Sequence, residues 1–197
     1  DSLLLLPGYD FKKALEIGGG DFNTLQELNQ RIKKHDLEMW GIDTHKSKGD
    51  NVKKIIGSVE SKLTKSLVPK SYFDIIIAND VVEHLVGTED FVKFVYKSLK
   101  PGGLFLISVP NARQIRMFYY LFIKGTFPRK ESGLFDKTHL RWFCKKDLND
   151  LVIKEGFDLL NFKSVGRFVP FFLERSVISE FIALQNIFLF EKNKKDM

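Results

Sequence analysis

The chain has 197 residues, a formal net charge of +6, and 44% hydrophobic and 28% charged residues, which is the balance of a folded globular chain. Charged residues interrupt every apolar run before it reaches the length of a membrane span, and the single cysteine, Cys144, excludes an internal disulfide. We expect Cys144 to be a buried structural thiol, and we expect no metal ligand set. One domain over residues 1–197, in the cytoplasm, is the resulting prediction. Because the chain begins with Asp1 and not Met, we expect upstream sequence to be missing.

Hydrophobic periodicity predicts alternating strands and helices in the first half of the chain. The expected strands span 13–17, 37–42, 52–57, 73–78 and 104–109, and the expected helices span 22–34 and 89–99. Residues 44–54 are polar and read as a loop, and a second loop runs from the third strand to residue 70. Strands that alternate with helices in this way predict an α/β fold with a doubly wound, mostly parallel sheet.

The pattern changes after residue 110, where we expect a lid or substrate insertion at about 111–143. It comprises an aromatic-rich helix over 112–124 and a long loop over 125–138. The helix could cover an acceptor, form a dimer contact, touch a membrane surface through residues 115–130 or pack in the core. A helix over 145–155 and strands over 157–165 and 186–191 complete the chain, and residues 166–185 read either as a loop or as short helices.

A glycine turn follows the first predicted strand, in the segment ALEIGGGDF at residues 14–22. Glycines allow the backbone to approach a ligand closely. Asp43 ends the next predicted strand, where its carboxylate can accept hydrogen bonds from both hydroxyls of a ribose. A dinucleotide fingerprint would need a glycine where Asn23 stands, so the spacing argues against a nicotinamide cofactor.

The pattern Glu16-x-Gly18-x-Gly20 resembles the first motif of class I S-adenosylmethionine-dependent methyltransferases, with Phe22 in place of its third glycine. Two later segments resemble the same family in the same order: SYFDIIIANDVVEHL at 71–85 and LKPGGLFLISVPN at 99–111. The resemblance implies a Rossmann-like, seven-stranded, mostly parallel sheet with an antiparallel last strand. It also implies S-adenosyl-L-methionine as the cofactor.

The resemblance also suggests roles for individual residues. Cofactor contacts are expected at Glu16, Gly18, Gly19, Gly20, Asp43, Ser58, Val59, Asn79 and Asp80. Asp80 reads equally as a helix cap, and His84 reads either as a group near the reacting centre or as a buried, hydrogen-bonded histidine. The family places an acid where Ser58 stands, and the short stretch after Asp43 leaves the adenine side of the site more open.

A second cluster, DKTHLRWF at residues 136–143, resembles a segment of methyltransferases from glycan or small-metabolite pathways. Asp136 could orient His139 as a general base, and Arg141 could clamp a phosphate or carboxylate of the acceptor, or the cluster could simply anchor the long loop. We predict methyl transfer to a small molecule, most plausibly at oxygen of a sugar-linked or lipid-linked metabolite. A quinone-type O-methyltransferase and an inactive, cofactor-binding partner subunit stay open. Nucleic acid is not an expected partner, because the lysines are not interleaved with a stacking platform.

Overall fold

The computed structural model describes residues 2–6, 8–32, 37–47, 49–166 and 179–194. Its strands are β1 (Lys13–Ile17), β2 (Glu38–Asp43), β3 (Val52–Ile56), β4 (Phe73–Asn79), β5 (Leu99–Pro110), β6 (Phe157–Val165) and β7 (Gln185–Lys192). They form one sheet in the order β3-β2-β1-β4-β5-β7-β6. β7 runs antiparallel to both of its neighbours, β5 and β6, whereas the pairs from β3 to β5 are parallel. The predicted seven-stranded sheet with an antiparallel last strand is confirmed.

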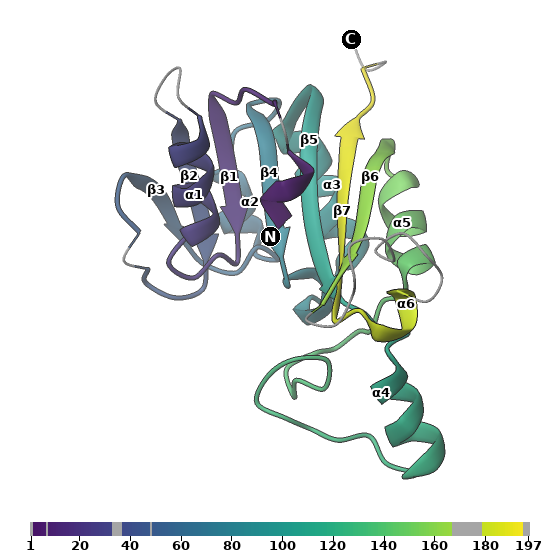
Figure 1. Cartoon of the computed structure of the whole chain (residues 1–197). Helices are drawn as coiled ribbons and strands as arrows, with labels where there is room; N and C mark the ends of the chain where they lie inside the picture. The colour runs from purple at the N-terminus through teal and green to yellow at the C-terminus, as the bar shows by residue number, and fades with distance from the viewer. Residues whose placement is uncertain (1, 7, 33–36, 48, 167–178, 195–197) are drawn as a thin grey trace.

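Helices lie on both faces of the sheet, and α4 lies on a segment that projects beyond it (Figure 1). They are the 3-10 helices η1 (Ser2–Leu5) and η2 (Val82–His84), the π-helix η3 (Tyr119–Ile123), and the α-helices α1 (Asn23–Arg31), α2 (Lys62–Ser66), α3 (Thr88–Ser98), α4 (Ile115–Phe118), α5 (Lys145–Ile153) and α6 (Ser179–Ile182). Buried side chains of η1 and α1 pack on one face, and those of α3 and α5 pack on the other. Each face therefore has its own hydrophobic core.

Alternation along the strands explains the two cores. In β4, Ile75 and Ile77 belong to the core under α1, and Ile76 belongs to the core under α3. In β5, Leu106 likewise belongs to the core under α1, and Phe105 belongs to the core under α3. Successive strand residues point to opposite faces, so a strand covered on both sides must be apolar throughout. The continuous apolar runs in the sequence are the result.

Several predicted boundaries were wrong, for identifiable reasons. α1 begins at Asn23 and not at Phe22, because Phe22 has a left-handed backbone with φ of 57°. The expected loop before residue 70 contains α2, whose one buried residue is Thr64, so it has no apolar stripe to predict it. β5 begins at Leu99, which pairs with Phe73, and a register shift accommodates the Pro-Gly-Gly turn. Cys144 was expected to be buried, but it is only partly buried and is the N-cap residue of α5.

Residues 111–143, here called the arm, project from the carboxyl end of β5 (Figure 1). A bridge between Asn111 and Phe143 closes the base of the arm. The expected single helix over 112–124 is instead α4 followed by η3, with no buried residue in either, so core packing was the wrong interpretation. Tyr120 and Phe127 pack edge-on against Phe135, at centroid distances of 5.1 and 5.5 Å, and hold the arm together. Its outer residues remain exposed.

The remaining predicted segments, 44–54 and 166–185, are described only in part. Residues 44–54 contain no helix over their described part, as the polar composition predicted. Of residues 166–185, α6 is a short helix, whereas 167–178 lie outside the described residues. Within the described part of the chain, no helix has the length and apolar character that crossing a bilayer requires.

Candidate active site

The carboxyl ends of four parallel strands border a cavity of about 370 Å³. Gly18 follows β1, Asp43 ends β2, Ser58 and Val59 follow β3, and Asp80 follows β4, and all five line the cavity. Ligands of open α/β sheets bind at this edge, where loops and strand ends supply the polar groups. The structure therefore brings together the predicted ribose and adenine contacts.

The glycine turn is tied to Asp43 by its backbone. Oδ2 of Asp43 accepts a hydrogen bond from the Gly20 N–H at 2.9 Å, and Oδ1 accepts one from the His45 N–H at 2.8 Å. Gly18 and Gly20 have φ of 69° and 56°, which is a conformation that glycine adopts without a steric penalty. Each carboxylate oxygen keeps a second lone pair, so Asp43 is held in place and can still accept from a ligand.

Glu16 lies beneath the turn and not in the cavity. Its side chain is buried, and Oε2 accepts a hydrogen bond from the Leu25 N–H at 3.1 Å, in the first turn of α1. Burial raises the pKa of Glu16 to about 7. Glu16 thus supports the loop from below, and its expected contact with a cofactor stays a prediction.

Phe22 replaces the third glycine of the motif and fills space that another glycine leaves. Phe22 is buried, and its ring lies over Gly41 of β2. A Cβ added to Gly41 would stand 2.3 Å from Cζ of Phe22 and 2.5 Å from its Cε1. The departure at Phe22 is therefore matched by a missing side chain on the neighbouring strand.

Three other predicted cofactor residues are not among those that line this cavity: Gly19, Gly20 and Asn79. Asn79 instead donates from Nδ2 to Oγ of Ser2 at 3.3 Å, so η1 lies against the end of β4. Their contact with a cofactor stays a prediction.

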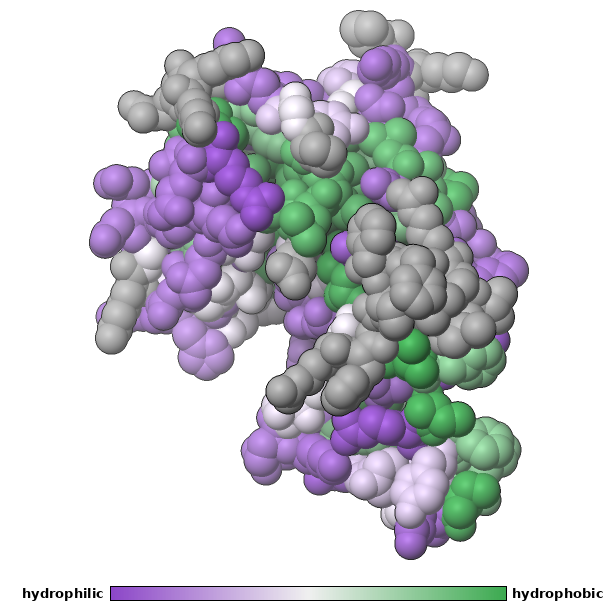
Figure 2. Space-filling view, in the orientation of Figure 1, coloured by the Kyte–Doolittle hydropathy of each residue, from purple (hydrophilic) through white to green (hydrophobic). Residues whose placement is uncertain are grey.

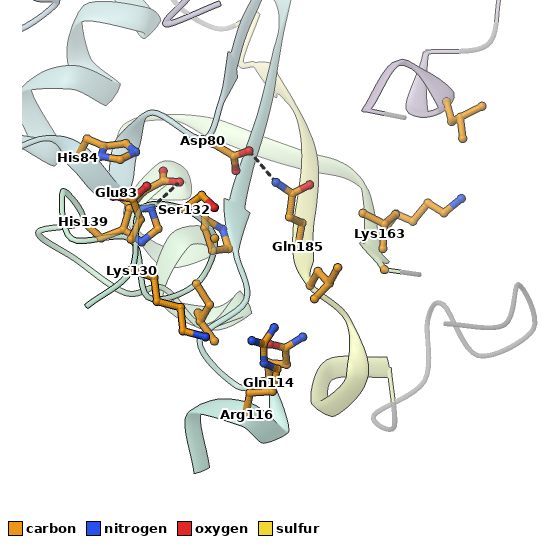
Figure 3. A pocket seen from close by; sticks show the side chains of 18 residues that line it. Asp80, Glu83, His84, Gln114, Arg116, Lys130, Ser132, His139, Lys163 and Gln185 are labelled. Atoms are coloured by element: carbon orange, nitrogen blue, oxygen red, sulfur yellow. Dashed lines mark hydrogen bonds and ion pairs between the residues drawn. The ribbon is translucent and has the colours of Figure 1, made fainter. Parts of the chain in front are cut away.

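A second, larger cavity of about 880 Å³ adjoins the first, and Asp80 and His84 line both of them. Figure 3 shows Glu83, His84 and His139 on one side of the larger cavity and Gln185 on the other, with Asp80 between them. The arm contributes eight lining residues: Gln114, Arg116, Lys130, Ser132, Gly133, Leu134, Asp136 and His139. The two cavities thus meet at a carboxylate and an imidazole.

Asp80 is fixed at this meeting point. Its Oδ2 accepts a hydrogen bond from Nε2 of Gln185 at 2.6 Å, and Oγ of Ser108 donates to Oδ1 at 3.5 Å. Burial raises the pKa of Asp80 above its usual range, and the hydrogen bonds oppose that rise. Gln185 was not predicted, because it comes from β7, far along the chain.

Glu83, His84 and His139 form a compact group. The imidazoles of His84 and His139 meet edge-on with centroids 4.8 Å apart, and Nε2 of His139 lies 4.0 Å from Oε1 of Glu83. Burial raises the pKa of Glu83 to about 8, and burial together with the neighbouring His84 lowers the pKa of His139. Glu83 was overlooked, although it precedes His84 in the quoted motif. A carboxylate next to a histidine, just after a strand, was the available signal.

Asp136 does not orient His139, contrary to expectation. Oδ1 of Asp136 accepts hydrogen bonds from the backbone N–H and the hydroxyl of Thr138, at 2.8 and 2.6 Å. Those bonds hold the pKa of Asp136 below its usual range. The carboxylate close to the His139 ring is that of Glu83, which sequence spacing could not indicate.

Arg141 is also placed differently from its predicted role. Its guanidinium donates to the carbonyl of Val86, and Arg141 is not among the residues that line the larger cavity. The cationic side chains that do line it are those of Arg116, Lys130 and Lys163. A contact between Arg141 and an acceptor therefore stays a prediction, and the cations that line the cavity come from the arm and from β6.

The smaller cavity fits the expected cofactor. Asp43 offers a restrained carboxylate for ribose hydroxyls, and Ser58 and Val59, the predicted adenine contacts, line the same cavity. Asp80 places a second carboxylate in this cavity, which suits a cofactor that carries a positive sulfonium. When bound, S-adenosylmethionine would supply an activated methyl group near Asp80 and His84.

Comparison with known proteins agrees with this site. A family described as "Methyltransferase domain" matches residues 2–161. Phosphoethanolamine N-methyltransferase 1 of Zea mays is 30% identical over 112 residues, covering 55% of this chain and 22% of that protein. The mitochondrial ubiquinone biosynthesis O-methyltransferase of Rattus norvegicus is 36% identical over 70 residues, covering 36% of this chain and 19% of that protein. This chain thus matches about a fifth of the length of these curated relatives.

A solved structure is similar in fold along almost the whole chain. It is the 1,6-didemethyltoxoflavin-N1-methyltransferase of Burkholderia thailandensis with bound S-adenosylhomocysteine, at a TM-score of 0.63 and 16% identity, covering 97% of this chain and 75% of that one. With the family match, the sheet order and the paired cavities, it leads to one conclusion. The chain belongs to the class I S-adenosylmethionine-dependent methyltransferases.

Proposed function

We propose that the protein transfers a methyl group from S-adenosylmethionine to a hydroxyl oxygen of a small, anionic, sugar-linked or lipid-linked metabolite. The observation that carries this proposal is the junction of the two cavities at Asp80 and His84. A cofactor in the smaller cavity and an acceptor in the larger one would meet there. In-line methyl transfer needs this alignment and the exclusion of water more than it needs covalent help from the protein.

The proton of the acceptor hydroxyl has candidate acceptors beside the junction. His84 and His139 lie on the same wall as Glu83 (Figure 3). A lowered pKa keeps the imidazole of His139 neutral and able to accept a proton near neutral pH. The oxygen then attacks the methyl carbon, and the electron pair of the broken carbon–sulfur bond returns to sulfur.

The cationic side chains of the larger cavity support an anionic acceptor. Arg116 and Lys130 come from the arm and Lys163 comes from β6, and the same cavity is also lined by Asp80, Glu83 and Asp136. Cations gathered in this way favour phosphate or carboxylate. The maize relative is named for a phosphorylated acceptor, with nitrogen as the acceptor atom. The carbon chemical shift of the transferred methyl group, measured by NMR of the product, separates O-methylation from N-methylation.

A quinone-type O-methyltransferase is the second candidate. It is supported by the name of the rat relative and by the apolar tip of the arm, which a membrane-embedded acceptor would require. Phe122 and Ile123 are 73% and 64% exposed. Figure 2 shows apolar side chains gathered on the arm beside hydrophilic ones. Lys124 and Arg129 follow in the sequence, a combination that suits an anionic bilayer surface.

Calorimetry with S-adenosylhomocysteine tests the cofactor half of the proposal. Asp43→Ala should weaken binding at least about tenfold, because it removes a charged acceptor of hydrogen bonds. Asp50→Ala is the matched control, because it removes an exposed carboxylate that does not line the cavity. Absence of binding to the wild-type chain would refute the proposal. Binding without methyl transfer to any acceptor would favour an inactive partner subunit.

One charge reversal and one introduced charge test the acceptor half. Lys130→Glu should raise the KM for an anionic acceptor while leaving affinity for S-adenosylhomocysteine unchanged, since Lys130 lines only the larger cavity. Phe122→Glu should reduce sedimentation with phosphatidylglycerol vesicles. Leu63→Glu is its control, because Leu63 in α2 is likewise 73% exposed. Equal loss in both variants would contradict a membrane role for the arm.

A further inference from the structure

We propose that Glu83, His84 and His139 bind one divalent transition-metal ion, such as Zn²⁺, at the wall of the larger cavity. One ligand atom from each side chain lies within 4.8 Å of the others. The inference deepens the proposed function, because the same cavity would receive the acceptor. It rests on three side chains that meet from two distant segments, η2 and the arm.

The first observation is an unsatisfied carboxylate. Glu83 is 1% exposed, and within the described part of the chain neither of its side-chain oxygens has a hydrogen-bond partner. Buried carboxylates are normally paired with a cation or with several donors, because an isolated one is costly. The backbone carbonyl of Glu83 accepts from the N–H groups of Leu140 and Arg141, which fixes the residue beside His139. A cation between the two side chains would satisfy the orphaned oxygens.

The second observation is the orientation of His84. The hydroxyl of Thr138 donates to Asp136, so the same hydroxyl can only accept from Nδ1 of His84, at 3.1 Å. The carbonyl of Thr138 also faces this nitrogen, at 3.3 Å. Nδ1 therefore carries the proton, and Nε2 keeps its lone pair. Histidines that bind metals are commonly held in this way, by a hydrogen bond from the other ring nitrogen.

The distances suit an ion after a small adjustment. Zinc binds nitrogen and oxygen ligands at about 2.0–2.2 Å, so two ligand atoms in a tetrahedral site lie about 3.4 Å apart. Oε1 of Glu83 and Nε2 of His139 are already 4.0 Å apart. The widest separation in the group would have to close by about 1.4 Å, which side-chain rotation can supply. Two imidazoles and one carboxylate favour a transition metal over Mg²⁺, which prefers oxygen ligands.

Three protein ligands leave a position for the acceptor. A hydroxyl bound to the ion would lose its proton to water in the open cavity, and its oxygen would then form a bond to the methyl carbon. The carbon–sulfur bond breaks and its electron pair stays on sulfur. The ion would thus lower the pKa of the hydroxyl. His139 would then act as a metal ligand and not as the base.

Titration of the untagged chain with Co²⁺ tests the site, because its visible absorption reports coordination. We expect one Co²⁺ per chain, displaced by Zn²⁺ but not by millimolar Mg²⁺. Glu83→Gln and His139→Ala should each weaken binding by more than the 10–100-fold typical of outer-shell partners. His45→Ala controls for adventitious imidazole binding, since His45 lies outside the group.

Two outcomes would overturn the proposal: no uptake by the wild-type chain, or equal affinity in Glu83→Gln. Calorimetry with S-adenosylhomocysteine on the same samples shows whether each variant is folded. It also separates the two proposals. Cofactor binding without metal uptake refutes the metal site alone, whereas loss of cofactor binding in the wild type refutes the methyltransferase proposal.

Discussion

Phe22 and Gly41 should be energetically coupled, because the ring of one occupies the space beside the other. A methyl group at Gly41 would lie 2.3 Å from Cζ of Phe22, whereas carbon atoms pack at about 3.5–4.0 Å. The ring would have to move by about 1.2 Å, yet Phe22 is 1% exposed and closely packed. Overpacking of this kind costs about 1–3 kcal/mol, and we expect about 2 kcal/mol for Gly41→Ala.

The same substitution should change sign once the ring is absent. Phe22→Ala alone removes a buried aromatic side chain and should cost about 3–5 kcal/mol. In that background Gly41→Ala no longer clashes. It should then be neutral or stabilise by up to about 1 kcal/mol, because alanine restricts the unfolded chain.

Urea unfolding of the four proteins, followed by circular dichroism, measures this cycle. The m-values should agree, so that midpoint shifts report the free energy of unfolding. We expect a coupling of about 2–3 kcal/mol, well beyond the additivity error of about 0.5 kcal/mol. If Gly41→Ala costs the same in both backgrounds, the close approach of ring and glycine does not explain this departure from the motif.

Three further predictions concern buried polar groups. The pKa of Glu16 is raised from 4.5 to about 7, so the folded state retains a proton that the unfolded state loses; stability should fall by about 3 kcal/mol as pH rises through that interval. Glu16→Gln should remove this dependence of stability on pH. If the urea midpoints of the wild type and of Glu16→Gln change with pH in the same way, the prediction is contradicted. Asn111→Ala should cost about 3 kcal/mol in thermal unfolding, because two backbone carbonyls in and after α6 lose their donor. Lys192→Met keeps the aliphatic stem but leaves the carbonyls of Tyr96 and Leu99 without an ammonium; we expect a loss of about 1–3 kcal/mol, and an unchanged midpoint would refute it.

The sheet was predictable because burial on both faces leaves a continuous apolar pattern. The strand over Phe73–Asn79 and the acid at the end of the second strand both follow from that local rule. Asp43, Ser58 and Val59 then reach one cavity, because parallel strands end at the same edge. These predictions needed only the order of elements along the chain.

Features that depend on contacts between distant segments could not be predicted. In the sequence, Gly41 is an ordinary strand glycine, and only the structure shows that the ring of Phe22 packs against it. The sequence suggested that Arg141 could clamp an anion, but it does not show that the guanidinium donates to the carbonyl of Val86. Core packing was one of the roles left open for the aromatic helix, because the sequence does not show that the arm leaves the sheet with its apolar residues exposed.

The base of the arm has a consequence for how acceptor choice can change. The arm departs at Asn111 and returns at Phe143, with the two residues bridged to each other. It supplies many of the residues that line the larger cavity and none of those that line the smaller one. Replacing the segment between the two bridged ends would therefore change the walls of the larger cavity and leave the glycine turn and Asp43 unaltered. The coupling between the two cavities then lies at His84, which lines the smaller cavity and whose Nδ1 contacts Thr138 of the arm.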